Sequence, residues 1–241
     1  MLISVFTPTY RSSATLETSY ASLEAQTNKK FEWIIVDDFS DDDNQTKNLI
    51  QRLQEKATFP VKTFFFNENH FGGASMAKAV ELAQGDLFVI LDHDDQLTSH
   101  SLQRAAELAK KYFAKKDVAG IVGRSEDENH VLIGKKFPQD VTVDYEGHLR
   151  YATGIFAEFA TFFRTSVLRE HVSIMKKGFT YGVLMATLSK GHKMVFVNDV
   201  FRIYDTAIET SYTNTPSVRT RYPKEQLEMN LIVMDIYKKY F

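Results

Sequence analysis

The chain has 241 residues, of which 44% are hydrophobic and 25% charged, the composition of a globular protein with a sizeable core. A formal net charge of −2 provides no basic field for nucleic acid, and the lack of cysteine excludes disulfides, thiolate metal ligands and thiol nucleophiles. No apolar run reaches the ~18 residues of a membrane span, and the first residues lack a signal-peptide pattern, so we expect a cytoplasmic protein.

The first 123 residues alternate between strand-like and helix-like patterns. Short apolar runs predict strands at residues 2–6, 33–36, 61–67, 87–91 and 117–123. Apolar residues at helical spacing predict helices between them, which begin after Ser12 or Ser13, after Ser40, after Gly72 and Gly73, and after Thr98 or Ser99. Ser40 is expected to cap its helix, with Asp43 in a capping box. This alternation is typical of an α/β fold in which helices flank a mostly parallel sheet.

The pattern is less regular after residue 124. A polar stretch at 124–150 indicates a loop or hairpin, and an apolar, aromatic stretch at 154–171 contains the isolated carboxylate Glu158. A helix is expected to end near Gly191, with a strand after it. The last predicted helix runs from Pro223 to Phe241 and carries the apolar residues Leu227, Leu231 and Met234.

Three carboxylates follow the strand at 87–91 within four positions: Asp92, Asp94 and Asp95. Like charges this close repel each other, so the arrangement needs a compensating interaction. A hard divalent cation would supply it, because Mg²⁺ and Mn²⁺ prefer carboxylate oxygen and leave room for a diphosphate. The alternative is that these residues form a solvated turn or favour the start of the following helix through its dipole.

Polar residues also follow two other predicted strands. Thr7 and Thr9 end the first strand, and Asp37 and Asp38 end the second. Parallel strands present their carboxyl ends at one edge, where ligands of α/β sheets bind. Asp38 could accept a hydrogen bond from a base or ribose, or it could belong to a simple turn.

Other residues near this edge have two interpretations each. Pro8 could fix a loop in which Thr7 and Tyr10 face a planar ring, or it could only lock a turn. Gly72 and Gly73 could approach a ligand or simply allow a tight helix entry. The seven histidines show no metal-ligand spacing, although His93 lies within the acidic corner.

Together these segments carry a family resemblance. "ISVFTPTYR", "EWIIVDDFSDD", "NENHFGGASMAKAVELAQGD" and "FVILDHDDQL" resemble, in order and spacing, the successive motifs of family 2 glycosyltransferases, which have the GT-A fold and use nucleotide-sugars. The resemblance implies a donor-binding half at 1–123 and an acceptor-binding half with a C-terminal helix at 124–241, in one globular unit. It further implies transfer of sugar from a UDP-sugar to an acceptor hydroxyl, in bacterial polysaccharide or glycolipid synthesis.

The resemblance also assigns roles to single residues. Asp38 would contact uracil, Asp92 would lie near the ribose, and Asp94, the second aspartate of the Asp-x-Asp, would bind Mn²⁺ or Mg²⁺. The metal would stabilise the departing diphosphate. The complete donor-binding set that it implies is Thr7, Pro8, Tyr10, Asp38, Asn69, Gly72, Asp92 and His93.

The chain departs from the family pattern at two places. The helix after Gly72 reads "SMAKA" where the family usually has Ala-Arg-Asn, so Lys78 could replace a donor contact. The usual Glu-Asp of the catalytic base is replaced by "FTYGV" at residues 179–183.

Glu158 is therefore the expected general base, since burial among phenylalanines would raise its pKa toward working pH. Alternatively, Glu158 only pairs with an arginine, Arg150 or Arg164. Asp205 is the second candidate for the base.

Two other functional classes remain as alternatives. The missing Glu-Asp would also suit a non-catalytic nucleotide-sugar-binding partner of another transferase, and acidic strand ends occur in Mg²⁺-binding receiver-like domains. We also expect a weak contact with the inner face of the membrane through a basic, aromatic helix end, or else a simply capped helix. The residues of this helix end are Tyr237, Lys238, Lys239, Tyr240 and Phe241.

Overall fold

One nine-stranded mixed sheet runs through the computed structural model, which describes residues 1–144, 147, 158–206 and 222–238. Its strand order is β3-β2-β1-β4-β8-β6-β9-β5, with β7 paired to β9. The strands are β1 (Ile3–Thr9), β2 (Phe31–Asp37), β3 (Val61–Phe65), β4 (Leu87–Ile90), β5 (Gln96–Leu97), β6 (Val118–Glu126), β7 (Val141–Val143), β8 (Phe159–Arg164) and β9 (Lys193–Ile203).

Strands β3, β2, β1 and β4 run parallel to one another, as the alternating sequence pattern predicts. The apolar residues of β1 and β2 are buried because helices cover both faces of this part of the sheet, whereas those of the edge strand β3 are only half-buried. The register pairs Thr9 with Asp37 and Asp37 with Phe65, so the carboxyl ends of β1, β2 and β3 lie side by side.

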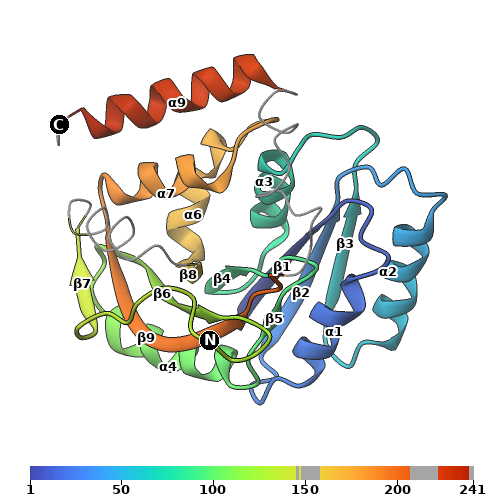
Figure 1. Ribbon diagram of the computed structural model, residues 1–241, viewed down its shortest axis with the longest axis horizontal. Helices are drawn as coiled ribbons and strands as arrows, with labels where there is room; N and C mark the ends of the chain where they lie inside the picture. The colour runs from blue at the N-terminus through green and yellow to red at the C-terminus, as the bar shows by residue number, and fades with distance from the viewer. Residues whose placement is uncertain (145–146, 148–157, 207–221, 239–241) are drawn as a thin grey trace.

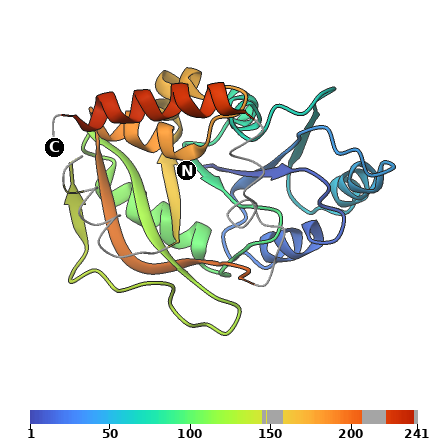
Figure 2. The same ribbon diagram turned by 45° about the horizontal axis from the view of Figure 1, so that its top comes forward.

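Two groups of helices cover the two faces of the sheet (Figure 1). On one face lie α1 (Leu16–Glu24), α2 (Gln45–Lys56) and α4 (Ser101–Tyr112), which share one apolar core. On the other lie α3 (Gly73–Leu82), α6 (Thr165–His171), the 3₁₀ turn η1 (Val172–Ile174) and α7 (Tyr181–Ser189), which share a second core. Helix α9 (Pro223–Tyr237) packs on the outer side of α7 (Figure 2).

The second half of the sequence completes the sheet that the first half starts. Strand β8 inserts between β4 and β6 and is antiparallel to both. Strand β6 continues to Glu126, beyond the predicted end at residue 123, and is parallel to β9. Because β8 is antiparallel to both β4 and β6, strands β6 and β9 run in the same direction as β4. Their carboxyl ends therefore lie at the same edge of the sheet as that of β4.

Two local expectations differ from the structure. Ser40 does not cap α2, because its hydroxyl instead donates to the buried carboxylate of Asp37 at 2.6 Å. Helix α2 begins only at Gln45, where Asp42 accepts from the backbone N–H of Thr46 at 3.1 Å. Asp43 has a φ of 53° and lies outside the helix, so it forms no capping box.

The last helix is apolar on both sides. Met229 and Ile236 are buried against α7, whereas Leu227, Leu231 and Met234 are 60%, 56% and 65% exposed. Within the described part of the chain, no helix combines the length and the apolar character needed to span a bilayer.

Candidate functional site

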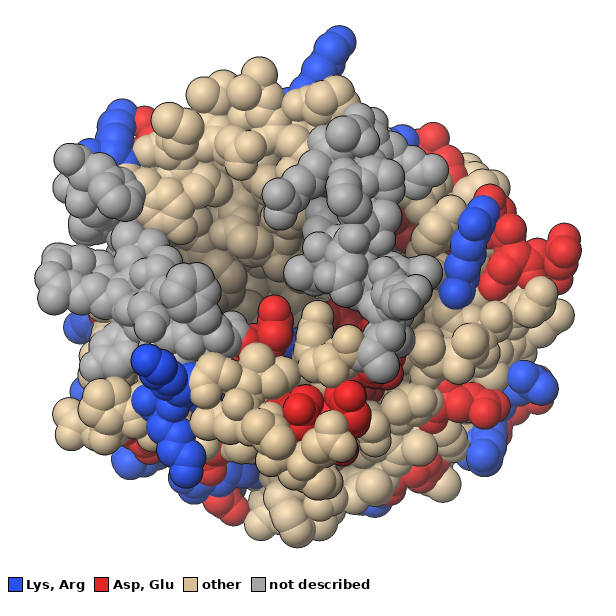
Figure 3. Space-filling model, in the orientation of Figure 1, with Lys and Arg blue, Asp and Glu red and all other residues tan. Residues whose placement is uncertain are grey.

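The carboxyl ends of the strands form an acidic edge. Figure 3 shows a hollow near the middle of one face, with acidic side chains along one side of it. The turn of residues 92–95 leaves β4 at this edge, closed by a hydrogen bond from the Asp95 N–H to the Asp92 carbonyl at 3.1 Å. The next residues form β5, whose Leu97 pairs with Arg202 near the end of β9. This pairing brings a cation from the second half of the sequence to the acidic turn.

Asp92 and Asp94 are partly buried, and no described residue gives either carboxylate a hydrogen bond or ion pair. Burial raises the pKa of the Asp92 carboxyl, and the nearby charge of Asp94 adds to the rise while Arg202 opposes it. Two unpaired carboxylates in a poorly solvated corner are costly unless a cation or proton joins them.

Asp95 has a different environment. It is 1% exposed, accepts from the backbone N–H of Asp205 at 3.1 Å and lies 3.2 Å from Arg202 Nη1. Burial raises the pKa of Asp95 to about 8; Arg202 opposes this rise, and Asp92 and Asp94 add to it. Asp95 is therefore a structural carboxylate that ties the turn to β9.

Arg202 compensates part of the negative charge of the acidic turn. Its guanidinium contacts Asp95 through Nη1 and Glu158 Oε2 through Nη2 at 3.3 Å, and its Nε donates to Ser125 Oγ at 3.1 Å. Sequence reasoning missed this residue. The available signal was a lone arginine between apolar residues in "VFRIY", a pattern that favours a paired cation at a sheet edge.

Glu158 lies just before β8 and pairs with Arg202, not with Arg164. Arg164 donates to the carbonyls of Phe113 and Lys115, each at 2.8 Å, and Arg150 lies outside the described residues. The side chain of Glu158 is 46% exposed, so the expected deep burial is not observed. The reason is its position at the end of a strand, where it reaches toward the edge and not into the core.

Asp38 holds the loop that follows β3. Its two carboxylate oxygens accept from the backbone N–H groups of His70 at 2.7 Å and Phe71 at 2.5 Å. Asn69 donates its amide to the Asp38 carbonyl at 3.0 Å, and its own Oδ1 is buried without a hydrogen-bond partner. Burial raises the pKa of Asp38, although these backbone amides oppose the rise.

The loop after β1 is fixed by a second network. Tyr10 donates its hydroxyl to Asp41 at 3.2 Å, and Arg11 forms a two-pronged pair with the same carboxylate at 2.6 Å. Thr7 is fully buried, and its hydroxyl accepts from the Trp33 indole at 2.9 Å, so that oxygen faces the core beside α1. Pro8 lies between Thr7 and Tyr10 in the sequence, within β1.

The remaining predicted donor residues lie around this edge. His93 Nδ1 is 2.7 Å from Thr15 Oγ1 at the start of α1. Gly72 has a φ of 70°, which only glycine adopts readily. Lys78 pairs with Glu81 at 2.6 Å on the same helix, so the structure gives it a partner away from the acidic turn.

The position of the family's usual base is closed by α9. Phe179 is 1% exposed within the core, and Thr180 donates through its backbone N–H and its hydroxyl to Met229 Sδ, at 3.4 and 3.3 Å. No described carboxylate replaces the missing pair at residues 179–181.

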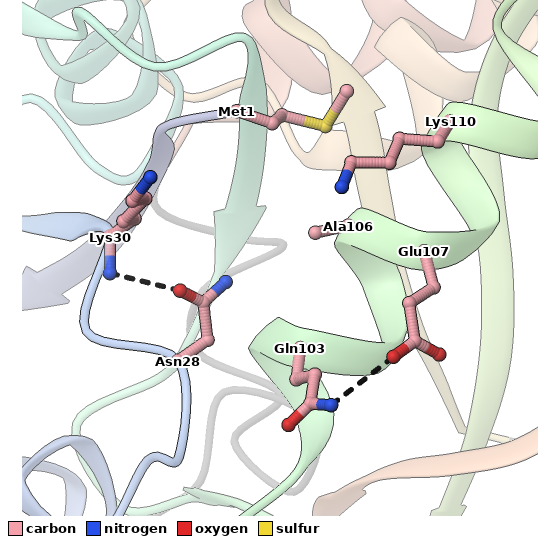
Figure 4. Close-up of a pocket in the computed structure, with 7 residues that line it drawn as sticks. All are labelled: Met1, Asn28, Lys30, Gln103, Ala106, Glu107 and Lys110. Carbon is pink, nitrogen blue, oxygen red and sulfur yellow. Dashed lines mark hydrogen bonds between the residues drawn. The ribbon is translucent and has the colours of Figure 1, made fainter.

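A surface pocket lies at the opposite edge of the sheet, close to where β1 and β2 begin (Figure 4). None of the predicted site residues lines it. Its lining residues are Met1, Asn28, Lys30, Gln103, Ala106, Glu107 and Lys110.

The acidic turn fits a divalent cation that takes further ligands from a substrate. No group of three His, Cys, Asp or Glu side chains converges among the described residues, so a closed protein cage is absent there. Asp92 and Asp94 instead supply unpaired hard oxygen donors, the set expected for Mg²⁺ or Mn²⁺ completed by phosphate and water.

Several known proteins are similar in sequence. A GalNAc(5)-diNAcBac-PP-undecaprenol beta-1,3-glucosyltransferase from Campylobacter jejuni is 28% identical over 204 residues, which cover 84% of this chain and 64% of that protein. The putative teichuronic acid biosynthesis glycosyltransferase TuaG from Bacillus subtilis is 33% identical over 106 residues, which cover 44% of this chain and 41% of that protein. The chain thus spans less than two thirds of the length of these relatives.

Solved structures share the fold. TarS (residues 1–349) from S. aureus in complex with UDP has a TM-score of 0.65 at 19% identity, covering 100% of this chain and 72% of that one. The mannosyltransferase PcManGT from Pyrobaculum calidifontis, in complex with GDP-Man and Mn²⁺, has a TM-score of 0.62 at 17% identity, covering 95% and 64%. The α/β architecture is therefore the GT-A fold that the sequence resemblance implies.

The family model described as "Glycosyl transferase family 2" matches residues 4–172. This segment includes every strand end of the acidic edge except that of β9. Sequence motifs, fold and family match agree, and the chain belongs to glycosyl transferase family 2.

Proposed function

We propose that this protein transfers a sugar from a UDP-sugar to a hydroxyl of a lipid-linked or polysaccharide acceptor, at the acidic edge of the sheet. The observation that carries the proposal is the pair of unpartnered carboxylates, Asp92 and Asp94, at the carboxyl end of β4. The UDP complex of TarS and the lipid-linked substrate named for the Campylobacter relative support the donor and acceptor classes.

Asp94, with Asp92 beside it, would hold Mn²⁺ or Mg²⁺ together with the donor diphosphate. When bound, the cation would supply charge stabilisation for the departing nucleoside diphosphate. The Mn²⁺ complex of the Pyrobaculum mannosyltransferase supports this metal class. Arg202 keeps Asp95 paired, which leaves the other two carboxylates available.

The nucleoside would lie over the loops that follow β1, β2 and β3. Asp38 and Asn69 are proposed to meet the uracil edge, since backbone amides fix the Asp38 carboxylate at this edge and Asn69 Oδ1 has no partner. Pro8, Tyr10, Gly72 and His93, with Thr7 beneath them, complete the proposed donor pocket.

Glu158 is proposed as the general base that takes the proton of the acceptor hydroxyl. Its half-exposed carboxylate is held by Arg202, whose other nitrogen reaches the acidic turn, so donor and acceptor groups would meet around one guanidinium. Asp205 is the second candidate, because its backbone N–H binds Asp95.

We further propose that the protein works in the cytoplasm at the inner face of the membrane. The contact predicted from the C-terminal residues includes 239–241, which lie outside the described residues. Lys238 pairs with Asp235, and Tyr237 is partly buried. The exposed apolar side chains of α9 therefore offer a better lipid contact than its end.

The decisive assay measures release of UDP and formation of glycosylated product from UDP-sugars, with Mn²⁺ present and with or without polyprenyl-phosphate-linked acceptors. A transferase gives product that increases with acceptor. A non-catalytic partner of another transferase would bind UDP with the same metal dependence and release neither UDP nor product.

A further inference from the structure

One exposed aromatic residue at the acidic edge has an unfavourable backbone conformation. Phe39, the second residue after β2, has a φ of 62°, a region that bulky L-residues rarely adopt. Its side chain is 45% exposed, and no ring or charged group of the described residues packs against it. Neither local propensity nor core packing accounts for a phenylalanine here, since glycine would adopt this backbone without strain.

The surrounding residues enforce this conformation. On one side, the Asp38 N–H donates to the Thr9 carbonyl at 2.8 Å. On the other, the Ser40 N–H donates to the Asp37 carboxylate at 2.9 Å. The backbone of Phe39 is therefore fixed between two anchored neighbours, and its side chain is exposed at the edge.

The position of the ring defines the ligand that it suits. Asp38 precedes Phe39 and binds the loop of His70 and Phe71, while Asn69 donates its amide nitrogen to the Asp38 carbonyl and keeps its amide oxygen unpaired. A flat apolar side chain in the loop that also holds an unpaired hydrogen-bond acceptor matches a nucleobase, which offers a π-face and N–H donors on its edge.

We propose that Phe39 is a specificity-determining residue whose ring stacks on the nucleobase of the donor. The inference rests on the proposed function, because it assumes that a nucleotide binds at this edge. Stacking would explain why a strained phenylalanine is kept where glycine would be more stable.

The test combines UDP affinity with thermal stability in four variants of the full chain. Phe39→Tyr should keep UDP affinity in Mn²⁺, whereas Phe39→Leu, Phe39→Ala and Phe39→Gly should lose roughly 5- to 150-fold, the range for loss of one base–aromatic stack. Phe39→Gly should melt about 2–4 °C above Phe39→Ala, because only glycine relieves the positive φ. Asn44→Gly, at a φ of 62° in the same connection, controls for backbone relief without loss of a ring.

The outcomes separate this inference from the proposed function. Wild-type affinity for UDP in Phe39→Leu would overturn the stacking role while leaving the donor site intact. Equal loss of UDP affinity in Asn44→Gly would attribute the effect to loop backbone and overturn it as well. Failure of the unchanged chain to bind UDP would overturn both proposals.

Discussion

Single side chains at the acidic edge divide into paired and unpaired groups. Asp95 and Glu158 are bound by Arg202, while Asp92 and Asp94 have no partner among the described residues. Charge repulsion in the turn is thus only partly compensated by the protein. A bound cation would relieve the remaining repulsion between Asp92 and Asp94. This explains why such a turn suits a site that binds diphosphate.

Asp38 combines a structural and a proposed recognition role, and substitution should reveal both. In Asp38→Ala, the buried N–H groups of His70 and Phe71 lose their acceptor, so the free energy of unfolding should fall by about 1–3 kcal/mol. The preference for UDP over CDP should also decrease. Urea unfolding and calorimetric titration measure the two effects. An unchanged preference would mean that the base is recognised elsewhere, and unchanged stability would disprove the anchoring role.

Glu158→Gln tests the proposed base, because glutamine still accepts a hydrogen bond from Arg202 but cannot take a proton. UDP affinity and melting temperature should stay at the wild-type values, while transfer to acceptor falls ~10²-fold or more. Asp205→Asn is the matched control and should transfer at nearly the wild-type rate. If the control loses activity and Glu158→Gln keeps it, Asp205 is the base; if Glu158→Gln unfolds readily, its carboxylate is mainly structural.

Helix α9 is the element whose role differs most from a simple helix end. Its inner residue Met229 accepts a hydrogen bond from Thr180, where the family usually has its base. Its outer residues Leu227, Leu231 and Met234 are exposed. A helix with apolar residues on both faces needs cover on both faces. The outer face is therefore a candidate surface for lipid.

Replacing Leu227, Leu231 and Met234 together by serine tests this surface. The wild-type chain should sediment with anionic vesicles at low salt, and the triple variant should lose most of that binding because the apolar contact is gone. Val131→Ser, at an apolar side chain that is 60% exposed elsewhere, should bind like the wild type. Equal sedimentation of the triple variant, or none by the wild type, would contradict the proposal.

Elements of the first half were predictable because their signals are local. The runs at β1, β2 and β4 are short and apolar, and each ends in or is soon followed by polar residues that mark the edge. The insertion of β8 between β4 and β6 was not predictable, since strand order depends on pairing between distant segments. The contact of Arg202 with Asp95 depends on that order and on the β5–β9 register, so spacing along the chain could not reveal it.

The orientation of α9 escaped prediction for a related reason. Its apolar residues occupy both sides of the helix, so periodicity does not identify the inward face. The prediction that Ser40 caps α2 was wrong for a local reason. A serine before a helical pattern can cap the helix or bind a nearby carboxylate, and Asp37 is only three residues away.

The whole molecule should show the acidic turn in its pH-dependent stability. The folded-state pKa of Asp95 is raised to about 8, above an unfolded value of about 3.9. Between these values the folded state binds more protons than the unfolded state, so stability falls as pH rises. Relative to Asp95→Asn, the metal-free wild type should lose stability from pH 5 to pH 8, by at most about 1.4 kcal/mol per pH unit. Parallel urea-unfolding profiles in chelator would contradict the assignment.

Asp94 and the donor diphosphate are proposed to share one divalent cation, and calorimetric titration with UDP measures whether they do. The wild-type chain and Asp117→Asn, a control at a carboxylate paired with Lys193 outside the acidic turn, should bind UDP more tightly with Mn²⁺ than with chelator. Asp94→Asn should lose this metal-dependent gain while keeping its melting temperature, because removing one of three crowded carboxylates relieves repulsion. Equal UDP affinity of the wild type with Mn²⁺ and with chelator would contradict the claim.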